Sequence, residues 1–390
     1  MNKFLEQFNK KRLISLVLFS FLVILIIFFI GDIFPSKYSQ ADIDLKKNII
    51  AEKKVVEKKI AVLDTVAYDL KLKQLANYPL PKPIVNATST PINNSKVTSG
   101  SKTIKPVETK PVTPPKPPLW PVKAPYPKVG ALLPFNRIIA YYGNFYSTKM
   151  GVLGEYPEAE MLSKLDAEAK KWEIADPTTP VIKAIDYIAI TAQGSAGSDK
   201  KYRFRMPDSQ IDKAVVLAKK VNGIVILDVQ VALSTLQIEL PLLEKYLKMP
   251  EVHLAIDPEF SMKTGDKPGS VIGTFDATDV NYAADYLAKL VKDNNLPPKI
   301  LIVHRFTEHM VTNYKNIKTL PEVQIVMDMD GWGGMAKKKN TYKSFVQQQP
   351  IQFTGFKLFY KNDLKQELNR MMTPNEVLKL QPQPSFIQYQ

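Results

Sequence analysis

The stretch GIVILDVQVALSTLQIELPLLEKYLKMPEVHLAIDPEF, residues 223–260, contains the pattern that decides the fold. Two runs of aliphatic residues, 223–230 and 252–260, enclose a segment with helical spacing at 241–249. Continuous Val, Ile and Leu runs are typical of strands that are covered on both faces, as in parallel sheets. The stretch therefore predicts a strand–helix–strand unit.

The same alternation extends over residues 131–390. Further candidate strands lie at 137–143, 184–191, 299–306, 323–330, 354–360 and 385–390, and further helical patterns lie at 158–173, 208–222 and 277–295. Helical patterns near 310–320, 341–349 and 361–380 are less clear. Eight strands with helices between them predict an α/β domain of the (β/α)8 TIM-barrel type. A doubly wound open sheet is the alternative.

The N-terminal segment LISLVLFSFLVILIIFFI, residues 13–30, contains no charge. Together with residues 31–34 it approaches the ~20 residues that a helix needs to cross a bilayer, so we predict a transmembrane helix at 13–34. Basic residues dominate 1–12 and Asp32 follows the segment, which predicts a cytoplasmic tail and a folded domain outside the cell membrane, extracellular or in the cell wall. A cleaved signal peptide is the alternative, but no small-x-small cleavage site follows the apolar run.

Two further segments are predicted between this anchor and the barrel. Residues 41–77 place apolar side chains at helical spacing, which predicts either a coiled coil that forms a homodimer or a solvated amphipathic helix. The apolar residues in question are Leu45, Ile49, Val56, Ile60, Leu63, Val66 and Leu70. Residues 78–130 are rich in Pro and Lys, which predicts a disordered linker. At ~3 Å per residue such a linker could hold the barrel on the order of 100 Å from the membrane.

Charge and cysteine content exclude several functional classes. The chain has a formal net charge of +15, but residues 1–130 carry 21 Lys and Arg against 9 Asp and Glu, which leaves only +3 for the rest. A nearly balanced folded domain argues against binding to nucleic acid, whereas a basic N-terminal region suits an anionic envelope surface. The chain contains no Cys, which excludes disulfides, thiolate metal sites and cysteine nucleophiles.

The candidate functional residues follow the strands, because TIM barrels perform their chemistry at the strand C-termini. Asp257 and Glu259 lie two residues apart at the end of one strand, so both carboxylates are expected on one face, where mutual repulsion raises one pKa. Asp328 and Asp330 repeat this spacing. The alternative is a structural role, in which Asp257-Pro258 only starts a turn. The candidate catalytic residues are Glu259, Asp257, Asp328, Asp330 and Asp228, and the candidate substrate-binding residues are Tyr141, Tyr142, Asn144, Gln230, His304, Trp332, Lys357 and Tyr389.

A resemblance adds to this pattern. The motifs LGEY (153–156), LDVQ (227–230), LAIDPEF (254–260), IVHRF (302–306) and MDMDG (327–331) make residues 137–390 similar to a group of secreted bacterial barrel domains of unassigned activity, on a glycoside-hydrolase-type barrel. Asp257 and Glu259 match the last Asp-x-Glu of the strand-four signature of chitinase-like glycosidases, and Asp328 or Asp330 falls near their strand-six Asp. The earlier acidic positions of that signature are Val252 and Ala255 here. Strand seven lacks the nucleophilic Glu of the larger retaining superfamily.

The resemblance implies roles for these residues. As a glycosidase, the chain would use Glu259 as general acid and Asp257 to tune it, with Asp228, Asp328 or Asp330 as base or substrate-orienting group. Trp332 and Tyr142 would stack on sugar faces.

We therefore expect a barrel that binds, and in the enzymatic case hydrolyses, an envelope polysaccharide or peptidoglycan, without cofactor or metal. A non-catalytic envelope-binding or scaffold module is the alternative. A metal-dependent hydrolase or deacetylase with His304 as ligand is a third, but His253, His304 and His309 show no paired ligand spacing.

Overall fold

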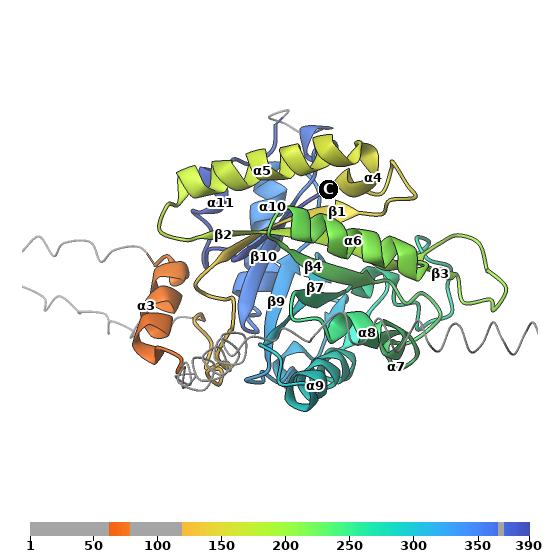
Figure 1. Cartoon of the computed structure of the whole chain (residues 1–390), viewed down its shortest axis with the longest axis horizontal. Helices are drawn as coiled ribbons and strands as arrows, with labels where there is room; N and C mark the ends of the chain where they lie inside the picture. The colour runs from red at the N-terminus through yellow and green to blue at the C-terminus, as the bar shows by residue number, and fades with distance from the viewer. Residues whose placement is uncertain (1–61, 79–118, 366–369) are drawn as a thin grey trace, which may run out of the picture. The chain divides into compact units, whose positions relative to one another are not determined.

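The computed structural model describes residues 62–78, 119–365 and 370–390. Its centre is a closed barrel of eight parallel strands (Figure 1). The strands are β1 (Arg137–Gly143), β2 (Val181–Ala192), β4 (Ile224–Val229), β5 (Val252–Ile256), β7 (Lys299–Arg305), β9 (Val323–Met329), β10 (Phe353–Leu358) and β11 (Phe386–Tyr389). Because β1 pairs in parallel with both β2 and β11, the sheet has no free edge at that point and the open-sheet alternative is wrong.

All eight predicted strands are present, and the strand that falls furthest short of its predicted length is β5. The prediction extended it to residue 260, but the strand ends at Ile256. Pro258 has no N–H for the ladder, and the chain turns into a short 3-10 helix, η2 (Pro258–Phe260). The Asp257 side chain caps this turn by accepting a hydrogen bond from the Glu259 N–H at 3.0 Å.

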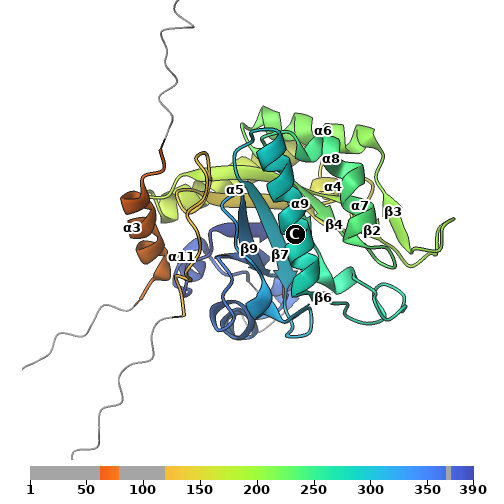
Figure 2. The ribbon, with the colours of Figure 1, turned by 90° about the horizontal axis from the view of Figure 1, so that it is seen from below.

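Helices cover the outside of the barrel (Figures 1 and 2). The longer ones are α5 (Glu158–Ala175), α6 (Asp208–Lys220), α9 (Ala277–Asp293) and α10 (Met335–Tyr342), and short ones are α4 (Val152–Glu155), α7 (Leu236–Glu239), α8 (Glu244–Leu247) and α11 (Pro374–Val377). In α9, Val280, Ala283, Leu287 and Val291 recur at helical spacing and are buried, so one face of the helix packs on the barrel.

The unclear helical patterns form less regular structure. Between β7 and β9, the pattern at 310–320 forms the short strand β8 (Val311–Thr312), which pairs with β6 (Phe275–Asp276), and a 3-10 turn, η3 (Tyr314–Asn316). The pattern at 341–349 continues α10 into a π-helical turn at Lys343–Gln347. The described part of 361–380 contains the 3-10 turn η5 (Asp363–Lys365) and α11. A three-residue strand, β3 (Arg203–Arg205), pairs antiparallel with the end of β2.

The core has two apolar layers because successive strand residues alternate between the two faces of the sheet. On β1, Ile139 and Tyr141 face the helices, whereas Ile138 and Ala140 belong to the inner cluster. The other barrel-strand members of the inner cluster are Ala184, Ile224, Ile226, Ala255, Ile300, Ile302, Val326, Phe353 and Phe386.

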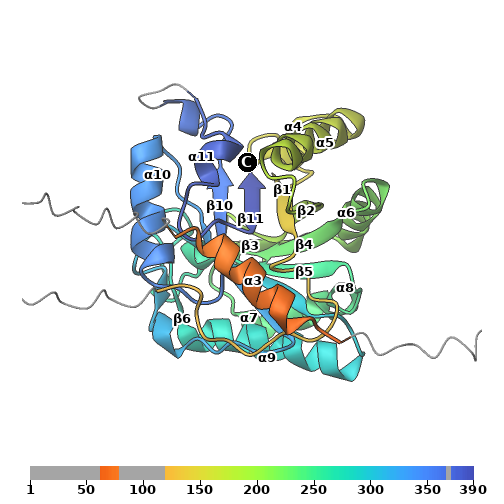
Figure 3. The same cartoon turned by 90° about the vertical axis from the view of Figure 1, so that its left-hand side faces the viewer.

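A helix outside the predicted domain covers the barrel end where the strands begin (Figure 3). In α3 (Thr65–Ala76), Tyr68 is buried and joins the inner cluster together with Leu133. Leu75 and Ala76 pack against Trp120, whose indole N–H donates a 2.7 Å hydrogen bond to the Gln352 carbonyl. We call the plug formed by α3, Trp120 and Leu133 the closed end.

This packing changes the expected domain organisation. The sequence places α3 in a separate helix at 41–77 and residues 119–130 in a linker, yet both pack against the barrel, so the folded unit extends beyond the predicted start at residue 131. The segment 79–118 therefore has both ends on the same folded unit and is no in-line spacer between α3 and the barrel. Val66 and Leu70, two residues of the predicted coiled-coil seam, are exposed. The homodimer stays a prediction.

Within the described ranges, no helix combines the length and apolar character that a membrane crossing requires. The predicted transmembrane segment 13–34 lies outside those ranges, as do the cytoplasmic tail, most of 41–77 and most of the predicted linker.

Candidate functional site

Toward the strand C-termini the barrel interior changes from apolar to polar. Asp186, Asp228, His304, Asp328 and Gln388 each follow an inner apolar residue of their own strand by two positions, so the period of the strand points them into the barrel. All five are fully buried. We call these five residues the inner polar layer.

His304 links the carboxylates of this layer. Its Nε2 lies 2.8 Å from Asp228 Oδ2, and its Nδ1 lies 3.2 Å from Asp328 Oδ2. Burial alone would lower the pKa of His304, but its bonds to Asp228 and Asp328 outweigh burial and hold that pKa well above its usual range. The ring is therefore an imidazolium at neutral pH, placed between two carboxylates.

The remaining polar atoms of the layer are only partly satisfied. Gln388 donates a 2.6 Å hydrogen bond to Asp186 Oδ2, and burial, followed by the charge of Asp228, raises the pKa of Asp186 to about 8. One oxygen each of Asp186, Asp228, Asp328 and Gln388 accepts no hydrogen bond from any described residue. Gly355 makes room for this layer, because a Cβ there would stand 2.5 Å from Asp328 Oδ1.

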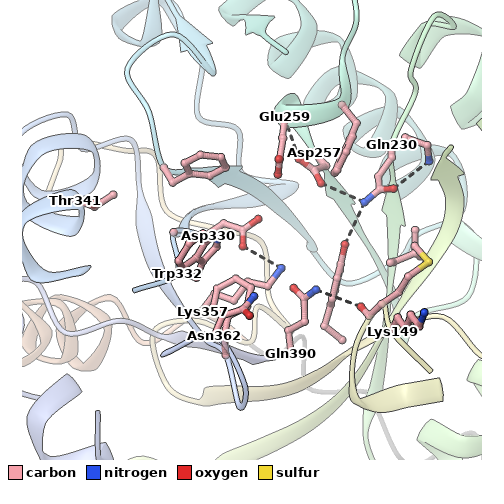
Figure 4. A pocket seen from close by; sticks show the side chains of 18 of the residues that line it. Lys149, Gln230, Asp257, Glu259, Asp330, Trp332, Thr341, Lys357, Asn362 and Gln390 are labelled. Carbon is pink, nitrogen blue, oxygen red and sulfur yellow. Dashed lines mark hydrogen bonds and ion pairs between the residues drawn. The ribbon is translucent and has the colours of Figure 1, made fainter. Parts of the chain in front are cut away.

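Above the inner polar layer the barrel opens into a cavity of about 510 Å³, which we call the mouth (Figure 4). Acidic, basic, aromatic and amide side chains line it together. Its polar and aromatic lining consists of Tyr142, Lys149, Gln230, Asp257, Glu259, Phe260, Phe306, Asp330, Trp332, Lys337, Thr341, Lys357, Phe359, Asn362 and Gln390.

The turn after β5 brings two carboxyl groups into the mouth. Asp257 is held by the Glu259 N–H and by Gln230, whose Nε2 lies 3.3 Å from Asp257 Oδ2. The Glu259 backbone is held from behind by Gly273, whose N–H donates a 2.7 Å bond to the Glu259 carbonyl. A Cβ at Gly273 would lie 2.6 Å from the Pro258 carbonyl oxygen, so only glycine allows this close approach without a shift.

Asp330 enters the mouth from the end of β9. Its Oδ1 forms a 2.9 Å ion pair with Lys357 Nζ, and its Oδ2 lies 3.5 Å from His304 Nδ1. Lys357 also lies over the Tyr142 ring, 3.9 Å from its centroid. Burial works against the charge of Lys357, but Asp330 outweighs it and raises the pKa of this ammonium group.

The two carboxyl groups of the turn, those of Asp257 and Glu259, both have a raised pKa. Burial, followed by the charge of Asp330, raises the pKa of Glu259 to about 7. Burial also raises the pKa of Asp257 well above its usual range, with Asp228 and Glu259 adding to it and His304 opposing it. Groups with a pKa near neutrality can donate and accept protons under ordinary conditions, which is the property that acid catalysis needs.

The same carboxylates form the one candidate metal cluster among the residues that the structure describes. Asp257, Glu259 and Asp330 each offer an oxygen, and these oxygens lie within 4.8 Å of one another. Oxygen ligands suit Mg²⁺ or Ca²⁺. However, the ammonium of Lys357 and the imidazolium of His304 already lie against Asp330, and two adjacent cations oppose a third.

The structure brings seven of the thirteen predicted site residues into the mouth. They are Glu259, Asp257, Asp330, Tyr142, Gln230, Trp332 and Lys357. Asp228, Asp328 and His304 are 0% exposed and lie in the inner polar layer, outside the lining of the mouth, so their catalytic and binding roles stay predictions. Strand periodicity points these three side chains into the barrel, but at a level below the mouth where other side chains fill the interior.

The other three predicted residues also do not line the mouth. Tyr141 and Tyr389 point to the helical side of the sheet, where the Tyr141 hydroxyl meets the Tyr360 hydroxyl at 3.0 Å and Trp172 donates to the Tyr389 hydroxyl at 2.9 Å. Asn144 is buried and donates a 3.0 Å bond to the Ile188 carbonyl.

Several lining residues were not predicted. Gln390 follows the inward Gln388 by two positions, and Phe306 directly follows β7, so strand periodicity carried a signal for both. Lys149 and Asn362 lie in loops far from one another in sequence, and no local pattern links them.

No protein-family model matches this sequence, and no curated protein matches it either.

Proposed function

We propose that the mouth binds a carbohydrate and that Glu259 and Asp330 cleave a glycosidic bond in it. One observation carries the proposal: Glu259, with a pKa of about 7, and the Lys357-bound Asp330 place carboxyl oxygens within 4.8 Å of each other in an accessible cavity. One proton donor beside one charge-paired carboxylate is the pair that glycoside hydrolysis requires.

In the first step, protonated Glu259 donates its proton to the glycosidic oxygen as the bond from that oxygen to the anomeric carbon breaks. Asp330 Oδ2 forms a bond to the same carbon, while Lys357 holds Oδ1. The short distance between the carboxyl groups leaves no space for a water molecule between them and favours this retaining route. In the second step a water molecule gives a proton to Glu259, and the water oxygen forms a bond to the anomeric carbon. The bond from that carbon to Asp330 breaks at the same time.

The rest of the lining supports a sugar ligand. Trp332 is 49% exposed and can offer a flat apolar surface, and Phe306 and Phe260 line the same cavity. Asn362 and Gln390 offer amide groups to hydroxyls, whereas the Gln230 amide is bound to Ala192, Tyr142 and Asp257. A cavity with apolar walls and a few convergent polar groups is typical of small-molecule sites.

We further propose that the barrel acts outside the cell, on a polysaccharide or peptidoglycan of the envelope. The support is the uncharged run 13–30 within the predicted transmembrane helix and the basic residues before it. Because 79–118 begins and ends on the barrel unit, the distance from this anchor depends on residues 35–61, which span at most roughly 90 Å when fully extended.

The direct test is hydrolysis by the full chain, followed as release of reducing ends from peptidoglycan and a panel of envelope polysaccharides. Glu259→Gln and Asp330→Asn should each lower the rate by about 10³-fold or more, because each removes a group that acts on the reacting atoms. Glu308→Gln is the matched control, since Glu308 is exposed and lies outside the mouth. NMR of the first-formed anomer should show retention.

Saturable binding of glycans without product, unchanged by Glu259→Gln, would favour the non-catalytic alternative instead. The three oxygens within 4.8 Å also keep the metal-dependent hydrolase as a second candidate. That candidate requires activity that a chelator abolishes and Mg²⁺, Ca²⁺ or Zn²⁺ restores. The acid mechanism proposed above requires activity that survives chelation.

A further inference from the structure

We infer that the glycan bound in the mouth is acidic, carrying carboxylate or phosphate groups that Lys337 and Lys149 recognise from the two sides of the cavity. This inference rests on the proposed carbohydrate function, because it names the class of substrate for the same site.

The first argument is that two of the three lysines in the mouth have no acidic partner. Lys357 is paired with Asp330 at 2.9 Å, but neither Lys149 nor Lys337 forms an ion pair with any described residue. Lys361, by contrast, lies 2.7 Å from Glu155. Lys337 instead lies over the Trp332 ring, with its Nζ 4.9 Å from the centroid.

The second argument is the sequence at the start of α10, which begins beside the mouth. The first five residues, 335–339, are MAKKK, and the first turn contains no acidic residue. The N-cap is Gly334, which has no side chain to cap the helix. The start of a helix carries partial positive charge, so lysines there are unfavourable and a bound anion is favourable.

Only part of this positive charge is matched within the protein. Asp363 accepts hydrogen bonds from Lys338 Nζ at 2.8 Å and from the Gly333 N–H at 2.9 Å. Lys337, one residue before Lys338, points to the mouth and stays unmatched among the described residues. An anion on the ligand would therefore meet Lys337 and the uncapped first turn together.

The third argument is the charge balance of the mouth. The charge of Asp330 is matched by Lys357, and burial raises the pKa of both Asp257 and Glu259, which favours their uncharged forms. When these two carboxyl groups are protonated, Lys149 and Lys337 leave the mouth positive in spite of its three acidic side chains. Such a cavity attracts anions and disfavours cationic sugars.

In Figure 4, Trp332 and Lys149 lie on opposite sides of the mouth, with Lys357 and Gln390 between them. Because Lys337 lies over the Trp332 ring, the two unpaired lysines lie on different sides of the mouth. Lys337 and Lys149 instead fit an extended ligand with anionic groups on more than one sugar unit.

The test compares matched oligosaccharides on an array, using the full chain with Glu259→Gln so that turnover does not remove the ligand. Uronate oligomers are paired with their carboxyl-reduced counterparts, and phosphate-bearing oligomers are paired with their dephosphorylated counterparts. The acidic member of at least one pair should bind about ten-fold more tightly, and the two pair types distinguish carboxylate from phosphate. Lys337→Gln and Lys149→Gln should each weaken that binding by about five-fold, the size expected for a partly exposed charge pair.

Lys339→Gln is the matched control because Lys339 is exposed on the same helix but does not line the mouth. It should leave the preference unchanged. Equal binding of neutral and acidic members, binding of neutral members alone, or no binding by any acidic member overturns the inference.

The outcomes separate this inference from the proposed hydrolysis. Cleavage of neutral glycans that is insensitive to Lys337→Gln would retain the hydrolase and exclude the acidic ligand. Selective binding of acidic oligosaccharides, with no product from the unsubstituted chain, would retain the acidic ligand and exclude the hydrolase.

Discussion

The two ends of the barrel are built in opposite ways. At the closed end, Tyr68 and Leu133 are buried and continue the inner apolar cluster. At the mouth, the carboxyl groups of Glu259 and Asp330 line a cavity of about 510 Å³. The difference places apolar packing at one end of the sheet and accessible carboxyl groups at the other, and TIM barrels in general divide stability and function between their two ends in this way.

The inner polar layer lies between these ends and belongs fully to neither. Its residues are as buried as the apolar cluster below, yet His304, which is 0% exposed, lies 3.5 Å from Asp330 in the mouth above. Buried charges are costly unless they are paired. The apolar closed end stabilises a barrel that contains this layer.

The largest expected effect comes from removing the closed end. A chain that begins at residue 131 lacks α3 and Trp120, and so exposes the strand starts and loses the burial of Tyr68, Leu75 and Trp120. At about 2 kcal/mol for each large side chain, the free energy of unfolding should fall by more than about 5 kcal/mol. Chemical denaturation of this chain and of one that begins at residue 62 measures the difference.

The chain that begins at residue 62 is the control, since it retains every described residue. Equal unfolding free energies for the two chains would mean that α3 contributes nothing to the barrel, and the contrast between its ends would then reduce to the mouth alone.

The second effect concerns the inner polar layer. His304→Leu leaves the carboxyl groups of Asp228 and Asp328 without their cation, and breaking a buried pair in this way costs about 4 kcal/mol. Urea denaturation at pH 8, where protonation of the unpaired carboxyl groups relieves the loss least, is the measurement. The double variant His304→Leu/Asp228→Asn should recover part of the loss at pH 8, and no recovery would contradict the pairing.

Much of this fold could be predicted from the sequence because each strand carries its own signal. A parallel strand covered on both faces is a continuous aliphatic run, such as GIVILDVQ at 223–230, and such runs are visible locally. The closed end could not be found in this way. Helix α3 is separated from its partners by more than 40 residues of Pro-rich sequence, and contacts as distant as Asn77 with Leu380 leave no periodic trace.

The sequence indicates which side chains point into the barrel, but not how far along the barrel axis each of them lies. A period of two correctly pointed Asp228, Asp257 and Asp328 into the barrel, yet it does not say how far up the barrel each one lies. Asp328 falls one layer too low, whereas Asp330, two positions further along, reaches the mouth. The relation of Asp257 to Glu259 was expected from a continuing strand, and it arises instead from the capped turn at Pro258.

The third prediction tests whether α3 acts through one face, as a plug should. Tyr68→Ala removes a ring that packs against Tyr126 and Phe135, with centroids 5.6 Å and 6.1 Å away, and should lower the unfolding free energy by about 3 kcal/mol. Val66→Ala, on the same helix but 69% exposed, should change it by less than about 0.5 kcal/mol. Thermal unfolding of the two variants gives the ratio. Similar losses for both would favour packing of the exposed face against a second chain, as the predicted homodimer requires.

The smallest expected change in unfolding free energy is at the mouth, where the proposed acid Glu259 should lower the stability of the fold at high pH. The pKa of Glu259 is raised from 4.5 to about 7, so the folded state binds this proton more tightly than the unfolded state. The resulting stability is fully present below pH 4.5 and is lost as pH rises through about 7. Glu259→Gln cannot ionise and should therefore be about 2 kcal/mol more stable than the unsubstituted chain at pH 8, with no gain at pH 4. Denaturation at the two pH values measures this, with Glu308→Gln as the exposed control. A gain at pH 8 that coincides with lost hydrolysis would identify Glu259 as a group held in place at the expense of stability. Equal stability at both pH values would show that its proton affinity is ordinary, and the mouth would then lack its acid.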